Sequence, residues 1–108
     1  MLAGMRAAVN GLLATGNDVI LDEMPIEAST MPTWRRDLRA SASCWVYVTA
    51  PLEVLERRER ERMSGRKSGN ARGHHRLGQG GDWDMVVNTD TATPGDAAAE
   101  IIRRCPFL

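Results

Sequence analysis

The chain has one lysine, two cysteines and no long apolar run. Each of these features excludes some classes of protein. Of its 108 residues, 43% are hydrophobic and 26% are charged, which is ordinary for a globular protein. No apolar stretch approaches the roughly 18 residues of a membrane-spanning helix, and the first residues lack the regions of a signal peptide. The sequence therefore predicts one cytoplasmic domain over residues 1–108, with no membrane partner.

A phosphate-binding glycine loop is also missing. The motif Gly-x-x-x-x-Gly-Lys-Ser/Thr needs a glycine directly before its lysine, but the single lysine, Lys67, follows Arg66. Lys67 also lies in a polar segment rather than between an apolar strand and a helix. This segment therefore cannot form the nest of backbone N–H groups that holds phosphates, and Lys67 is interpreted as a loop cation.

The two cysteines and the balanced charge exclude further classes. Cys44 and Cys105 are isolated in apolar contexts, with no second cysteine or paired histidine at metal-ligand spacing, so we expect two buried free thiols. The 14 basic residues are balanced by 14 acidic ones, which argues against a general polyanion binder. No nucleic-acid partner is expected.

Local patterns predict an α/β protein in which helices and strands alternate. Apolar residues at steps of three and four over residues 2–13 predict a first helix, which Gly16-Asn17 ends. Further helices are predicted after Thr30, from Pro51 to about Arg62, and after the N-cap Thr93. Three strands are predicted, namely Asp18–Asp22, Cys44–Thr49 and Met85–Asn88. Because strands and helices alternate, we expect a parallel sheet with helices on both faces.

The charged residues are unevenly distributed. Eight Lys/Arg and four Glu lie between Glu53 and Arg76, and the polar, glycine-rich residues 63–81 are predicted to form a mobile, lid-like loop. The simplest interpretation of the basic run is a solvated helix with i,i+4 ion pairs. A second interpretation is a phosphoryl-transfer site in which arginines neutralise phosphate and the strand-end Asp22 orients Mg²⁺. Asp22 could equally cap the next turn.

Six segments in order carry a resemblance to a known family, namely Gly4–Val9, Gly16–Glu23, Pro51–Arg62, Gly69–Arg72, Trp83-Asp84 and Val87–Pro94. Together they cover nearly the whole chain, and their order and spacing are fairly specific. They resemble the second part of the chloramphenicol phosphotransferase-like kinases, P-loop kinases that phosphorylate small molecules from ATP.

The resemblance implies a partial P-loop kinase-type sheet with an arginine-rich lid, ATP and Mg²⁺ as cofactors, and a small-molecule hydroxyl as substrate. It implies that Asp22 is the strand-end acid that contacts the metal. It also implies two sets of site residues. The phosphate-binding set is Arg58, Arg62, Arg66 and Arg72. The nucleotide-binding set, near the adenine, is Asn88, Thr89, Thr91 and Thr93.

The chain also departs from the family pattern. In this family the phosphate loop, the acid that activates the substrate hydroxyl and the central strand precede the first helix found here, so we expect this chain to lack all three. We therefore expect an inactive kinase that holds neither ATP nor Mg²⁺ tightly. The alternative is a non-catalytic remnant or complementation module that needs a partner's strands, and strand edges left unpaired would favour self-association.

Overall fold

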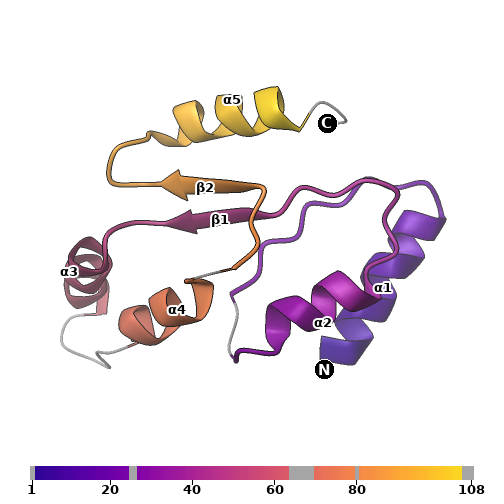
Figure 1. Cartoon of the computed structure of the whole chain (residues 1–108), viewed down its shortest axis with the longest axis horizontal. Coiled ribbons are helices and arrows are strands. Elements are labelled where there is room, and N and C mark those ends of the chain that lie inside the picture. The colour runs from indigo at the N-terminus through magenta and orange to yellow at the C-terminus, as the bar shows by residue number, and fades with distance from the viewer. Residues whose placement is uncertain (1, 25–26, 64–69, 80, 106–108) are drawn as a thin grey trace. The chain divides into compact units, whose positions relative to one another are not determined.

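The computed structural model describes residues 2–24, 27–63, 70–79 and 81–105. These residues form an α/β structure (Figure 1), and they divide into two compact units, Met1–Ser43 and Cys44–Leu108, here called the first and second units. No helix in the described residues is long and apolar enough to cross a membrane. The elements in chain order are α1 Leu2–Ala14, α2 Thr30–Asp37, β1 Val46–Thr49, α3 Leu52–Met63, α4 Asn70–Gly78, β2 Met85–Asn88 and α5 Pro94–Arg104.

The first unit contains α1 and α2. As the sequence predicts, α1 ends at Gly16-Asn17, where Gly16 has a φ of 88° that other residues rarely adopt. The Gly16 N–H donates to the carbonyl of Leu13 at 3.2 Å, and the Asn17 N–H donates to that of Leu12 at 3.1 Å. These bonds satisfy carbonyls that the helix end leaves without partners.

The predicted strand Asp18–Asp22 is not a strand. Residues 17–24 have no regular secondary structure, and the Ile20 side chain is 94% exposed although the sequence predicts a strand buried on both faces. A strand is held by backbone bonds to a neighbour, and within the described residues no neighbour pairs with this segment. The prediction of three strands is therefore wrong for this structure, and the two strands found are β1 and β2.

The second unit contains the sheet, in which β1 and β2 pair in parallel. The register places Val46 opposite Met85 and Thr49 opposite Asn88, so both strands end at the same edge of the sheet. The predicted bounds of β2 are confirmed, whereas β1 begins two residues later than predicted. Figure 1 shows α5 running beside β2, with α3 and α4 on the side of β1.

The α5 helix begins after Thr93, as the sequence predicts. Met85 and Val87 of β2 are buried, and Cys105 directly after α5 is 2% exposed. Within α5, Ile102 is 62% exposed and Ala98 is exposed as well. The predicted burial of Cys105 is therefore confirmed.

Part of the predicted loop 63–81 is helical instead, because α4 spans Asn70–Gly78. Contacts with distant residues stabilise this glycine-containing helix. The buried Glu59 of α3 accepts a hydrogen bond from the Ala71 N–H at 2.9 Å, which satisfies a donor in the first turn of α4. The Tyr47 hydroxyl of β1 donates to the carbonyl of His75 at 3.3 Å. A lid role for this segment stays a prediction.

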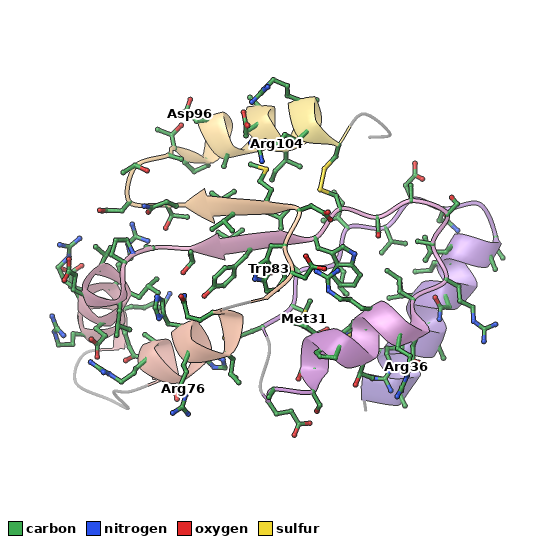
Figure 2. All side chains as sticks on the ribbon, in the orientation of Figure 1. Met31, Arg36, Arg76, Trp83, Asp96 and Arg104 are labelled. Carbon is green, nitrogen blue, oxygen red and sulfur yellow. A yellow bond between two sulfur atoms is a disulfide. The ribbon has the colours of Figure 1, made fainter. Side chains whose placement is uncertain are left out.

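The two cysteines are not free thiols, which corrects the expectation from sequence. Cys44 and Cys105 form a disulfide, visible as a yellow bond in Figure 2, and no cysteine in the described residues is free. The bond joins the segment before β1 to the end of α5 across 61 positions. Isolation in sequence could not reveal this pairing, because the parallel sheet and its following helix bring the two residues together.

Candidate functional site

The carboxyl ends of β1 and β2 are joined through Thr89. Its backbone N–H donates to the carbonyl of Thr49 at 2.8 Å, and its hydroxyl Oγ1 donates to the same carbonyl at 3.2 Å. Thr89 directly follows β2, and Thr49 is the last residue of β1. These bonds extend the pairing of the strands by one residue, at the edge where parallel α/β sheets place their ligands.

Arg58 of α3 reaches this edge. Its guanidinium donates from Nη1 to Thr89 Oγ1 at 2.7 Å and from Nη2 to the Thr89 carbonyl at 3.2 Å. Arg58 is half-buried, so the two bonds hold a positive charge in a defined orientation beside the strand ends. A guanidinium has five N–H donors, and these two bonds leave donors available for another acceptor.

The turn after β2 is held by its own hydrogen bonds. Asn88 Oδ1 accepts from the Asp90 N–H at 2.9 Å, and the Asn88 carbonyl accepts from the N–H groups of Thr91 and Ala92 at 3.3 and 3.0 Å. The Thr91 hydroxyl donates to the same carbonyl at 3.4 Å. Asn88 and Thr91 are exposed, so the turn presents two polar side chains from a constrained backbone.

Thr93 has a structural partner within α5. Its hydroxyl accepts from the Asp96 N–H at 3.1 Å, while the Asp96 carboxylate accepts from the Thr93 N–H at 3.4 Å. This reciprocal pair is the capping box that starts the helix, and the sequence predicts Thr93 as its N-cap. Figure 2 shows Asp96 in the first turn of α5.

Within the described residues, the other predicted phosphate-binding arginines form no hydrogen bond with Thr89. Arg72 of α4 forms an ion pair with Glu56 of α3 at 3.2 Å. Arg62 is exposed on α3, four residues after Arg58. Successive helix residues are about 100° apart, so Arg58 and Arg62 share one face of α3 and Glu56 lies on another. Arg66 lies outside the described residues.

Asp22 is exposed on the irregular segment of the first unit. No group of three or more His, Cys, Asp or Glu side chains that could hold a metal occurs in the described parts of the chain. Magnesium prefers several oxygen ligands, often including substrate phosphates, and one carboxylate is a poor site without them. The described residues therefore do not fit a Mg²⁺ held by the protein alone.

The oriented guanidinium of Arg58 suits an oxyanion such as phosphate better than it suits a metal. Arginine guanidiniums match phosphate oxygens in geometry and charge, and Arg58 is already oriented at the strand ends. The link from Arg58 to Thr89 crosses 31 positions, and no local pattern signals it. The family resemblance implies Thr89 as a nucleotide-binding residue, but nothing in the sequence indicates that it contacts Arg58.

Comparison with known proteins places the chain in a family. Residues 1–106 match the family model described as chloramphenicol phosphotransferase-like protein. No match was found among curated proteins or among solved structures. The family match covers nearly the whole chain and confirms the resemblance inferred from the ordered sequence segments, so the chain belongs to the chloramphenicol phosphotransferase-like family.

Proposed function

We propose that this chain belongs to an ATP-dependent phosphotransferase that phosphorylates a hydroxyl group of a small molecule. The observation that carries the proposal is the family match over residues 1–106. The position of Arg58 at the carboxyl ends of two parallel strands supports it, because a phosphoryl-transfer site needs fixed positive charge there.

In the proposed site, Arg58 provides oriented positive charge. Its bonds to Thr89 hold the guanidinium in place, so little reorganisation is needed when phosphate oxygens arrive. Bound ATP would supply the transferable phosphoryl group. Arg62, on the same face of α3, adds a second cation that attracts the phosphates.

Arg66 and Arg72 are proposed as further cations near the phosphates. Arg72 is constrained, because Glu56 already neutralises it in an ion pair. A phosphate that recruits Arg72 must therefore compete with that carboxylate. Asp22 is proposed as a metal contact only when phosphates of the substrate complete the coordination.

The turn over residues 88–93 is proposed to lie beside the base of the nucleotide. Bonds within the turn use Asn88 Oδ1 and the Thr91 hydroxyl proton, so Asn88 Nδ2 can still donate and Thr91 Oγ1 can still accept a hydrogen bond there. Thr89 and Thr93 support the turn, the first by holding Arg58 and the second by starting α5.

These 108 residues alone are proposed to attract ATP weakly without transferring phosphate. They contain no glycine loop to hold the γ-phosphate in line, and phosphoryl transfer depends almost entirely on positioning and charge stabilisation. The expected ATP association is therefore salt-sensitive, since it depends on arginines rather than on a closed pocket.

An NMR titration of the ¹⁵N-labelled chain with ATP tests this proposal. We expect shifts at residues 57–62 and 88–93 at low salt that weaken at 0.5 M NaCl. Arg58→Gln should weaken ATP binding several-fold. Arg60→Gln makes the same charge change on the exposed, opposite side of α3 and should leave binding nearly unchanged. Equal losses in the two variants would indicate general charge attraction and contradict the proposal.

Transfer itself requires a second assay. If the coding region upstream contains an in-frame Gly-x-x-x-x-Gly-Lys-Ser/Thr motif, the longer product is assayed with labelled ATP and a panel of hydroxyl compounds. We expect transfer from the longer product, none from the 108 residues alone, and loss of most activity on Asp22→Asn. Full activity of the 108-residue chain, or an active Asp22→Asn enzyme, would refute the assignment.

A second candidate function is a non-catalytic module that is completed by another chain. The exposed apolar side chains of the small sheet favour it, because Val48 is 61% and Val86 is 57% exposed. A two-stranded sheet also leaves strand edges that can pair with a second chain. Sedimentation at increasing concentration tests this candidate, since self-association predicts a rising average mass and a single monomeric species argues against it.

A further inference from the structure

A groove in the first unit is independent of the site described above. It has a volume of about 670 Å³ and lies between α1 and the carboxyl end of α2, with every lining residue between Ala3 and Arg39. Ala7 and Gly11 of α1 contribute to its wall, where a methyl group and a hydrogen atom leave room beside the helix. Ligand pockets commonly have volumes of about 300–1,000 Å³, so the groove can take a small molecule.

Three arginines and one carboxylate line the groove. Arg6 Nε lies 2.9 Å from Asp37 Oδ2, and Arg36 forms a two-pronged pair with the same carboxylate at 2.8 and 3.1 Å. Figure 2 shows Arg36 on α2. The third arginine, Arg39, is exposed, and its guanidinium has no hydrogen bond or ion pair with the residues that the structure describes. The single carboxylate therefore leaves an excess of positive charge in the groove.

Hydrogen bonds to Asn10 hold these groups in place. Asn10 Nδ2 donates to the backbone carbonyl of Asp37 at 2.8 Å, and Asn10 Oδ1 accepts from the backbone N–H of Arg39 at 2.8 Å. One amide of α1 thus fixes the chain where it leaves α2. A backbone that is already ordered reduces the entropy lost when a ligand binds.

The lowered pKa of Asp37 is consistent with the basic residues that line the groove. The hydrogen bond from Arg36, together with the charges of Arg36 and Arg6, lowers the pKa of Asp37 below its ordinary value. The carboxylate is therefore ionised at neutral pH, where it neutralises only part of the charge of the three guanidiniums.

We propose that this groove binds a small organic anion, with a phosphate or carboxylate group against Arg36 and Arg39 and a small apolar body against the alanine-lined side of α1. The planar, multiply donating guanidinium is suited to both anions. This site is distinct from the proposed nucleotide site, because none of its residues belongs to the phosphate-binding or nucleotide-binding set. The two proposals therefore succeed or fail separately.

An NMR titration of the ¹⁵N-labelled chain with phenyl phosphate and with benzoate tests the proposal, with inorganic phosphate in a third arm. We expect saturable shifts confined to residues 3–14 and 36–39, and tighter binding of at least one aromatic anion than of inorganic phosphate. The first two arms separate a phosphate ligand from a carboxylate ligand. Shifts that do not saturate, or shifts centred on the second unit, would overturn the proposal.

Matched variants distinguish the groove from general charge attraction. Arg39→Gln should weaken binding about fivefold, roughly the loss of one solvent-exposed hydrogen bond. Arg36→Gln should weaken it as well, and Arg60→Gln in the second unit should not. Arg39 contributes only its backbone to the fold, so Arg39→Gln should keep the spectrum of the folded chain. Unchanged affinity in both groove variants, or an equal loss in Arg60→Gln, contradicts the proposal.

Discussion

Arg58 and Thr89 are joined by two hydrogen bonds across 31 positions of the chain, at 2.7 Å to the hydroxyl and 3.2 Å to the carbonyl of Thr89. The Thr89 hydroxyl also donates a hydrogen bond to the Thr49 carbonyl of β1. The helix that follows β1 is thereby tied to the turn that follows β2. A residue proposed to bind phosphate therefore also supports the second unit.

The Arg58–Thr89 hydrogen bonds predict that substitutions of these two residues have non-additive effects on the free energy of unfolding. Thr89→Val removes the hydroxyl that accepts from Arg58 and donates to Thr49, so we expect a loss of about 1–2 kcal/mol in the free energy of unfolding. Thr89→Ser keeps the hydroxyl and should retain most of the stability. In urea unfolding, the double variant Arg58→Gln with Thr89→Val should cost less than the sum of the single changes. Simple additivity would show that the two side chains do not interact in solution.

Gly78 provides a test of packing between α4 and the sheet. A Cβ atom at Gly78 would overlap the ring of Tyr47, which stacks on Trp83 with ring centroids 5.1 Å apart. We expect Gly78→Ala to destabilise the chain by about 1–3 kcal/mol, because a packed core tolerates added volume poorly. The measurement is the urea midpoint, read by tryptophan fluorescence.

Gly73 is the matched control for that change. It lies in the same helix with open space around its Cα, so Gly73→Ala should stabilise the helix by up to about 1 kcal/mol. If Gly73→Ala and Gly78→Ala shifted the midpoint in the same direction, the packing of Tyr47 against α4 would be contradicted.

Substitutions of Thr93 test whether its structural role in the capping box of α5 is separate from a role in binding a ligand. Thr93→Ala removes the acceptor for the Asp96 N–H, and we expect a cost of about 1 kcal/mol by chemical denaturation. Thr93→Ser preserves the acceptor and should be nearly neutral. ATP-induced shifts at Asn88 that survive in Thr93→Ala would show that the cap and the proposed nucleotide contact are independent.

Asp37 predicts a component of acid sensitivity in the first unit. Its pKa is lowered in the folded chain, chiefly by the Arg36 hydrogen bond, so the unfolded chain binds more protons at low pH. The stabilisation is therefore fully present above its ordinary pKa of 3.8 and is lost as the pH falls through the lower folded value. Asp37→Asn should reduce stability at pH 7 but have a smaller effect at pH 2.

Urea titrations at the two pH values check this expectation, with Asp18→Asn as a control. Asp18 is exposed. Asp18→Asn removes the same charge from the first unit as Asp37→Asn does, but it breaks no ion pair in the groove. An identical pH dependence for Asp37→Asn and the unmodified chain would contradict the predicted linkage. The carboxyl resonance of Asp37 provides an independent measure of its pKa.

The sequence alone determined the features that depend on neighbouring residues. The cap at Gly16-Asn17, the bounds of β2 and the N-cap Thr93 were all predicted, because each depends on residues a few positions apart. The parallel pairing of β1 and β2 was also predicted, since a helical connection between adjacent strands constrains their direction. The ordered segments further indicated the family.

Only the tertiary structure decided the features that need a distant partner. Residues 18–22 have the composition of a strand yet form none, because a ladder requires a neighbour with matching backbone groups. Residues 70–78 have the composition of a loop yet form α4, with Glu59 and Tyr47 supplying hydrogen bonds from other elements. The free energy of these tertiary contacts outweighs the weak local propensity. The residues near in sequence do not reveal these contacts.

The candidate site divides in the same way. The sequence identified Arg58 and Thr89 as candidates, but only the fold brought them into contact. The groove around Arg39 could not be predicted, because its charge depends on how α1 and α2 share the carboxylate of Asp37. The sequence determines which chemical groups are present. Whether those groups form a site depends on the distances between them, and these distances are set only when the chain packs.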